Sequence, residues 1–226
     1  MTDHYTSSKT GSGHWREVYN ANARLYKAFA AGFHLFGIAR QRRCMMDALK
    51  LQSGDTVVDL CCGSGQNFAD LEDRVGRNGR IVGVDISGNM LALARERVEK
   101  QGWRNVELVE ADVESFRLPP DTAAVISTFG LDIVPDVDPV VEDIAAQMPD
   151  GARLGLLGSK EPAGWPDWLV EFGMCLNRPF DIERHHLAIR PDLAAAASLD
   201  ETDRRSFWAG IFYWSVAVKP ADRRAA

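Results

Sequence analysis

One short apolar run, which stops near an acid and breaks into glycines, constrains the fold of this chain most. Residues 57–60 are rich in β-branched side chains and include Asp59, and Gly63 and Gly65 follow closely. Such a run suits a strand buried in a parallel sheet, and glycines beyond its carboxyl end let the backbone approach a ligand. Because ligands of open α/β sheets bind at this edge, the run predicts a nucleotide-type site.

Two further runs also lead to acids. The strand expected at residues 80–84 precedes Asp85, whose carboxylate suits the two hydroxyls of a ribose. The next strand leads to Asp112, placed where an acceptor would take the amino group of an adenine. A dinucleotide fingerprint needs glycines where Cys61 and Phe68 stand. The acids therefore predict an adenosine-type ligand other than NAD.

The rest of the chain alternates between strand-like and helix-like patterns. This alternation predicts an α/β fold with a Rossmann-like, doubly wound, seven-stranded sheet, mostly parallel and closed by an antiparallel C-terminal hairpin. The expected strands are residues 56–60, 80–84, 106–109, 123–127, 152–157, 205–208 and 211–218. The expected helices are residues 15–36 (one helix, or two broken near Gly32), 38–50, 66–75, 88–101, 139–147, 165–176 and 191–197.

We expect a disordered tail over residues 1–14, because that stretch is polar and lacks an apolar core. Residues 15–226 should form one domain. Within it we expect a helical lid at 15–50, a cofactor-binding half at 51–160, and substrate-side helices with the closing hairpin at 161–226.

The composition argues against several kinds of partner. A net charge of −6 and a pI near 5.4 give no basic footprint for nucleic acid, so a small-molecule partner is favoured. The four cysteines form no C-x-x-C pair, which speaks against a metal site and for a reducing cytoplasm. The apolar-leaning stretch at residues 25–39 contains Lys27 and His34 and is too short to span a bilayer.

Three spaced motifs resemble those of the class I S-adenosylmethionine-dependent methyltransferases. Residues 59–65, DLCCGSG, match the D-L-G-C-G-T-G loop of that class. Residues 83–87 match its G-x-D-x-S, and residues 90–94 match the M-L-x-x-A helix that follows. The resemblance implies S-adenosylmethionine as the cofactor and methyl transfer as the reaction.

A narrower resemblance is to the ubiquinone and menaquinone C-methyltransferases, the UbiE-like group. Residues 19–26 carry its aromatic-alanine-tyrosine signature, and residues 129–136 and 148–154 are also similar to that group. Two positions differ from the pattern, because Cys61 replaces the first loop glycine and Asp132-Ile133 stands where the quinone enzymes have Arg-Asn.

The motifs and the resemblance together give a predicted site. Aromatic residues at 129, 165 and 168 are expected to wall the acceptor pocket, namely Phe129, Trp165 and Trp168. The expected cofactor contacts are Tyr19, Tyr26, Asp59, Cys61, Gly63, Ser64, Gly65, Asn67, Asp85, Ile86, Met90, Asp112, Val113 and Ser127.

Methyl transfer from a sulfonium depends mainly on alignment and on exclusion of water, but a phenol or hydroquinone acceptor also needs a base. Asp132 is the first candidate, because it ends the loop beside the methyl donor. His34 is a second candidate, and His185 and His186 are further ones, since the histidine pKa of roughly 6.5 suits the task.

The leading hypothesis is S-adenosylmethionine-dependent methyl transfer to a lipophilic small molecule, either quinone-like or another aromatic metabolite. Arg40, Arg42 and Arg43 follow an apolar helix and leave open a phospholipid N-methyltransferase peripheral to a membrane. Two hypotheses compete with these methyltransferases, namely a nicotinamide oxidoreductase and a non-catalytic cofactor-binding module. A homodimer is also left open.

Overall fold

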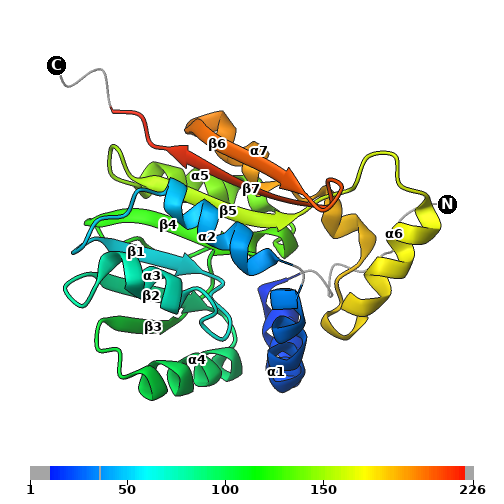
Figure 1. Ribbon diagram of the computed structural model, residues 1–226, viewed down its shortest axis with the longest axis horizontal. Coiled ribbons are helices and arrows are strands. Elements are labelled where there is room, and N and C mark those ends of the chain that lie inside the picture. Colours follow the sequence, from blue (N-terminus) through cyan, green and yellow to red (C-terminus); the bar gives the residue numbers. More distant parts are fainter. Residues whose placement is uncertain (1–10, 36, 222–226) are drawn as a thin grey trace.

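The computed structural model describes residues 11–35 and 37–221 and shows a seven-stranded sheet with helices on both faces (Figure 1). The strand order is β3-β2-β1-β4-β5-β7-β6. Neighbours from β3 to β5 pair in parallel, whereas β7 is antiparallel to both β5 and β6. The predicted doubly wound fold with a closing hairpin is confirmed. The side chains of residues 26–35 and of Leu176 are not described, so the predicted site residues Tyr26 and His34 lie outside the described residues.

Most predicted strands and helices are present, with bounds shifted by a few residues. The strands are β1 (Thr56–Leu60), β2 (Arg80–Asp85), β3 (Val106–Glu110), β4 (Thr122–Thr128), β5 (Arg153–Ser159), β6 (Asp200–Phe207) and β7 (Phe212–Val218). The helices are α1 (Ser12–Leu35), α2 (Ile38–Ala48), α3 (Phe68–Val75), α4 (Gly88–Gln101), α5 (Val137–Gln147), α6 (Asp167–Met174) and α7 (Pro191–Ser198). Three short 3-10 helices are η1 (Leu131–Ile133), η2 (Cys175–Phe180) and η3 (Arg184–Ala188).

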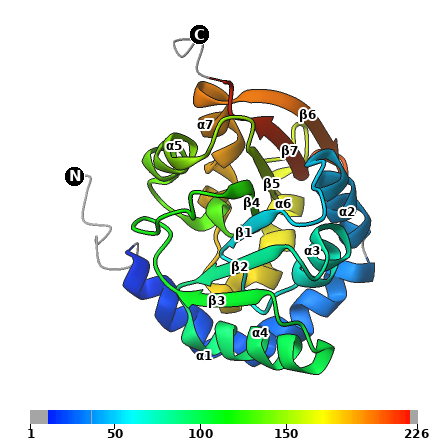
Figure 2. The same ribbon diagram turned by 90° about the vertical axis from the view of Figure 1, so that its left-hand side faces the viewer.

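Alternation along β1 divides its side chains between two cores. Val58 and Leu60 pack with the core that α5 and α7 cover. Val57 packs with the core under α2, α3 and α4, on the opposite face (Figure 2). Because side chains in a strand alternate between faces, Asp59 points to the same face as Val57. The acid therefore lies beneath α2 and α3.

The position of β1 in the sheet creates the binding crevice. It pairs with β2 on one side and with β4 on the other, so the crossovers leave it in opposite directions. At such a switch point the loops after neighbouring strands separate at the carboxyl edge of the sheet. The loops after β1, β2, β3 and β4 all lie at this edge.

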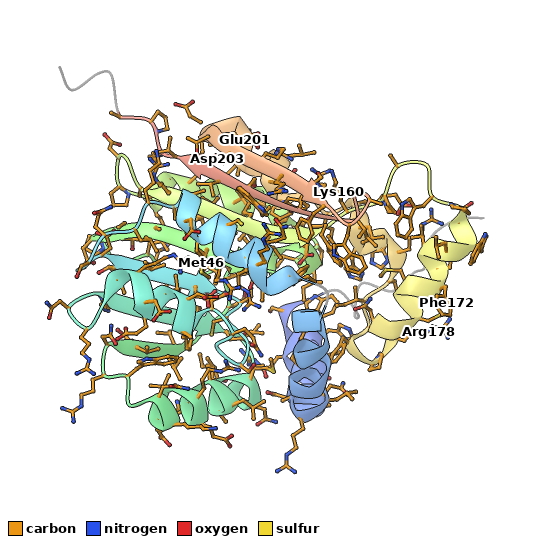
Figure 3. The ribbon with its side chains drawn as sticks, in the orientation of Figure 1. Met46, Lys160, Phe172, Arg178, Glu201 and Asp203 are labelled. Carbon is orange, nitrogen blue, oxygen red and sulfur yellow. The ribbon has the colours of Figure 1, made fainter. Side chains whose placement is uncertain are left out.

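Strand β6 begins at Asp200, earlier than the predicted start at Arg205. Its first residues, DETDRR, are exposed and charged and show no apolar alternation, so periodicity could not reveal them. Glu201 and Asp203 lie on this outer strand (Figure 3). Charges along an edge strand discourage pairing with another sheet.

Helix α1 also differs from expectation. It begins at Ser12 and runs without a break past Gly32, so the tail predicted over 1–14 is wrong for residues 12–14 and the helix break is wrong. His14, inside the expected tail, has its Nε2 atom 2.8 Å from a carboxylate oxygen of Asp181. Contacts with a distant segment stabilise this helical turn despite its polar composition.

Among the described residues, no helix combines the length and the apolar character needed to cross a membrane.

Candidate active site

Asp85 joins the loops that follow β1 and β2. One of its oxygens accepts the Gly63 backbone N–H at 2.8 Å, and the other accepts the Ser87 N–H at 2.9 Å. Burial raises the pKa of Asp85 to about 6, and these two backbone hydrogen bonds limit the rise. A carboxylate has about four acceptor positions, so it can also bind ligand hydroxyls. The acid thus fits the predicted ribose position.

Asp59 has a different environment, although it also lies near the end of a strand. Its side chain is fully buried, and both oxygens accept the side-chain amide of Asn67, at 2.9 and 3.1 Å. Arg42 donates to the Gln66 carbonyl oxygen nearby. Burial raises the pKa of Asp59 to about 7, against the lowering effects of the Asn67 hydrogen bond and the Arg42 charge. Asp59, Asn67 and Arg42 thus form a buried polar cluster that packs against the glycine loop.

Cys61 occupies the first glycine position of the loop motif. Its φ of +55° lies in the left-handed region that favours glycine. A β-carbon at position 130 would lie only 2.3 Å from the β-carbon of Cys61, so Gly130 makes room for this side chain. Burial, and then the charge of Asp85, raise the pKa of the Cys61 thiol, which stays neutral. Cys61 and Gly130 therefore fit together where the loops after β1 and β4 meet.

These loops and α1 surround a cavity that is open at its mouth, and the space between its walls, open solvent included, is about 760 Å³. Acidic residues line the β2–β3 side, namely Asp85, Asp112 and Glu114. Apolar residues line the side after β4, namely Phe129, Ile133, Val134 and Pro135. The cavity therefore combines an acidic side with an apolar one.

Helix α1 is fastened to the acidic side through Asn20. Ser87 Oγ donates to the Asn20 side-chain oxygen at 2.7 Å, and the Asn89 side chain donates to the Asn20 carbonyl at 2.9 Å. Arg16 donates to the Ile86 carbonyl at 3.3 Å. The start of α1 is thereby held across the amino-terminal end of α4.

The opposite flank of α1 contacts η2 and η3. Tyr19 stacks on Phe180 with ring centroids 6.1 Å apart, and Trp15 makes an edge contact with His186 at 5.4 Å. Because Trp15 and Tyr19 also line the cavity, α1 connects the cofactor-side loops to the segment after α6.

The structure brings nine of the predicted site residues to the cavity wall. They are Tyr19, Cys61, Gly63, Asp85, Ile86, Met90, Asp112, Val113 and Phe129. Five predicted cofactor contacts do not line it, because they are buried beneath the loop or within the sheet: Asp59, Ser64, Gly65, Asn67 and Ser127.

The candidate bases with described side chains do not line the cavity either. Asp132 is buried on η1, and its Oδ2 accepts the backbone N–H and the hydroxyl of Ser159, both at 3.1 Å. His185 is exposed on η3. His186 Nδ1 accepts the Glu183 N–H at 3.0 Å, so the basic nitrogen of its neutral ring is occupied. The prediction of Asp132 as a base beside the methyl donor lacks support from this geometry.

The predicted acceptor-binding aromatics are also separated. Phe129 lines the cavity, whereas Trp165 packs against a small cluster formed by α6 and η3. Trp168 is 70% exposed on α6, as is Phe172, which lies at the end of the molecule remote from β3 (Figure 3). The helical pattern after residue 165 could not show which face of α6 packs inward.

Sequence reasoning missed nine lining residues, namely Ser12, Trp15, Val84, Ala111, Glu114, Gly130, Ile133, Val134 and Pro135. Several of them are sequence neighbours of predicted residues at the ends of β2, β3 and β4. Trp15 had a detectable signal, because it precedes Tyr19 by four residues and so shares its helix face.

The fold is that of the S-adenosylmethionine-dependent methyltransferases. The crystal structure of one such enzyme from Aquifex aeolicus aligns with a TM-score of 0.58 at 19% identity, over 78% of this chain and 88% of that one. Residues 9–163 match the ubiE/COQ5 methyltransferase family, and the chain belongs to this family.

Two relatives share the matched region. A demethylmenaquinone methyltransferase from Listeria welshimeri is 29% identical over 127 residues, which cover 55% of this chain and 54% of the relative. An enzyme of the same name from Shouchella clausii is 26% identical over 151 residues, 65% of this chain and 64% of the relative. The chain thus spans about half the length of the first of these relatives. Helices α6 to α7 and the closing hairpin lie beyond the family match.

The groups that line the cavity fit S-adenosylmethionine. Asp85 has acceptor positions for ribose hydroxyls, and Asp112 has them for the adenine amino group. A sulfonium cation is also favoured by the three acids on this side of the cavity. The loop with Gly63 lets the backbone approach the ligand.

Proposed function

We propose that this protein methylates a carbon atom of a quinone-type acceptor in its reduced, hydroquinol form, with S-adenosylmethionine as the methyl donor. The observation that carries the proposal is that one cavity is lined by Asp85 and Asp112 and also by the apolar residues Phe129, Ile133 and Val134. Membership of the ubiE/COQ5 family and the demethylmenaquinone methyltransferases among its relatives support this acceptor class.

Residues of the chain would hold the cofactor at defined places. Asp85 would accept the ribose hydroxyls, Asp112 the adenine amino group, and Ile86 and Met90 would cover the adenine ring. The bound cofactor would supply an electrophilic methyl group on a sulfonium. The S–CH3 bond breaks as the C–C bond forms, S-adenosylhomocysteine leaves, and the ring carbon loses its proton to solvent. The chain would position this methyl group, because the loop that contains Gly63 would fix one end of the cofactor.

The apolar side would hold the acceptor and keep water out. Phe129 and Ile133 lie on the loop that follows β4, which contacts the loop carrying Cys61 at Gly130. Alignment and desolvation lower the barrier of an in-line displacement. Since the described candidate bases do not line the cavity, we assign catalysis chiefly to positioning and exclusion of water.

The phospholipid hypothesis depends on three arginines after the aromatic helix. Arg42 is buried and donates to the Gln66 carbonyl, so it is not available to a lipid phosphate. Arg40 and Arg43 remain exposed. This geometry does not favour a phosphate site formed by all three residues.

The proposed activity is tested by incubating the purified protein with methyl-labelled S-adenosylmethionine under anaerobic conditions. One reaction contains 1,4-naphthohydroquinone and another contains phosphatidylethanolamine vesicles. We expect label on a ring carbon of the naphthohydroquinone. Label on the lipid alone would contradict the proposal, and tight cofactor binding without transfer to either compound would favour a non-catalytic module.

A further inference from the structure

Trp15 presents an unused hydrogen-bond donor at the cavity. The residue is on the first turns of α1, lines the cavity and is 8% exposed. Its indole nitrogen, Nε1, is buried and has no hydrogen-bond partner among the residues that the structure describes. Leaving a buried donor unpaired is unfavourable, so an N–H kept in this place calls for a partner.

Other buried polar atoms also lack a hydrogen-bond partner in the described part of the chain. They belong to Ser127, Asp132, Arg153 and Tyr213, and His14 Nε2 meets only the Asp181 carboxylate described above. None of these residues lines the cavity, whereas Trp15 does. Among these residues of the described chain, Trp15 is therefore the one that borders the cavity.

Two aromatic contacts hold the indole in place. The His14 ring meets it at 5.2 Å and an interplanar angle of 67°, and the His186 ring meets it at 5.4 Å and 75°. A donor whose ring is held this way loses little further freedom when a ligand binds. The direction of the N–H is thus set before the ligand arrives.

The surroundings select an uncharged ligand atom. Burial, and then the neighbouring His185, lower the pKa of His186, so the ring beside Trp15 is neutral. Asp85, Asp112 and Glu114 line the same cavity and disfavour an anion such as a phosphate or carboxylate. A neutral N–H in this cavity suits a hydroxyl or carbonyl oxygen.

We propose that the indole N–H of Trp15 binds an uncharged oxygen of the methyl acceptor and thereby orients the acceptor ring. The inference rests on the proposed function, and it gives a residue of α1 a role in binding the acceptor. Asp85 already offers acceptor positions for the cofactor hydroxyls, whereas Trp15 contacts His186 on η3, which lies beyond the family match.

The kinetic test compares Trp15→Phe with the wild type and with Trp103→Phe, a partly buried control that packs against the core under α2–α4 and does not line the cavity. Phenylalanine keeps an aromatic ring but lacks the donor. With naphthohydroquinone we expect kcat/KM of Trp15→Phe to fall up to about tenfold, as for one hydrogen bond, and cofactor affinity to change less than about twofold. Unchanged kcat/KM, or a loss confined to cofactor affinity, would overturn the inference.

A second measurement uses the wild-type protein and needs no turnover. The chain has six tryptophans, so the indole N–H signals can be resolved by NMR and Trp15 identified by its absence in Trp15→Phe. With S-adenosylhomocysteine bound, naphthohydroquinone should move the Trp15 signal downfield and naphthalene should not. If neither compound moves it, or S-adenosylhomocysteine alone does so, the inference is wrong. A wild type that gives the shift without methylation would instead refute the proposed function.

Discussion

The two sides of the cavity are built in different ways. On the cofactor side, the loops after β1, β2 and β3 come from consecutive strand–helix units within residues 56–114. On the acceptor side, the loop after β4 meets α1 and η3, so residues far apart in sequence form one wall. The cofactor side is therefore specified by local patterns and the acceptor side by long-range contacts. Substitutions should affect the two sides independently if this comparison holds.

The largest expected effect concerns the acid beneath the cofactor loop. The pKa of Asp59 rises from 3.8 to about 7 on burial, so the folded state binds this proton more tightly than the unfolded state. The resulting stabilisation is complete below about pH 4 and disappears as the pH rises through 7. Its ceiling is about 4 kcal/mol.

Urea unfolding of the wild type and Asp59→Asn between pH 4 and pH 8 measures this dependence. The free energy of unfolding of the wild type should fall with pH relative to that of the variant. Asp200→Asn on the exposed edge strand should behave as the wild type. Parallel curves for wild type and Asp59→Asn would show that Asp59 does not titrate in this range.

The next largest effect lies where the two sides meet. In Gly130→Ala the new methyl group would lie 2.3 Å from the β-carbon of Cys61, and overpacking of this kind costs about 1–3 kcal/mol. Cys61→Gly should restore most of the loss when combined with Gly130→Ala, because it removes the clashing atoms. The free energy of unfolding of all four proteins gives the coupling, and purely additive losses would contradict the match between these residues.

An effect of similar size is expected for cofactor affinity. Asp85→Ala should weaken S-adenosylmethionine binding by about 1.5–3 kcal/mol, the range for hydrogen bonds to a charged group. Ligand hydroxyls favour the ionised carboxylate, whose pKa is about 6, so wild-type affinity should rise with pH through 6 and then level off. Calorimetry of Asp85→Asn should show no such rise. If the affinity of the wild type did not change with pH in this range, Asp85 would not be the residue that binds the ribose.

The smallest effect is expected at Asp132. Its carboxylate binds Ser159 and does not line the cavity, so Asp132→Asn should cost about 1 kcal/mol of stability and leave turnover nearly unchanged. A general base would lose about a hundredfold or more in rate. Such a loss, measured with naphthohydroquinone at unchanged cofactor affinity, would support Asp132 as the catalytic base and contradict its exclusion from the cavity.

The regular elements were predictable because their signals are local. Strand β1 has its predicted bounds, and helix α4 begins at Gly88 as predicted, with Ser87 capping it. Periodicity failed at β6, where charged residues on an edge strand carry no apolar alternation. It also failed at the start of α1, where a contact between His14 and Asp181 decides the structure.

The sequence by itself determined the α/β class, the glycine loop after β1 and the acid at Asp85, because strand length, alternation and glycine position are properties of neighbouring residues. Only the tertiary structure decided that Asp59 faces α3, that Asp132 turns to Ser159 and that Trp15 reaches the cavity. Each of these depends on which face of an element meets a partner far away in the chain. Burial and pairing of polar groups, which set their pKa and their chemistry, follow from that partner.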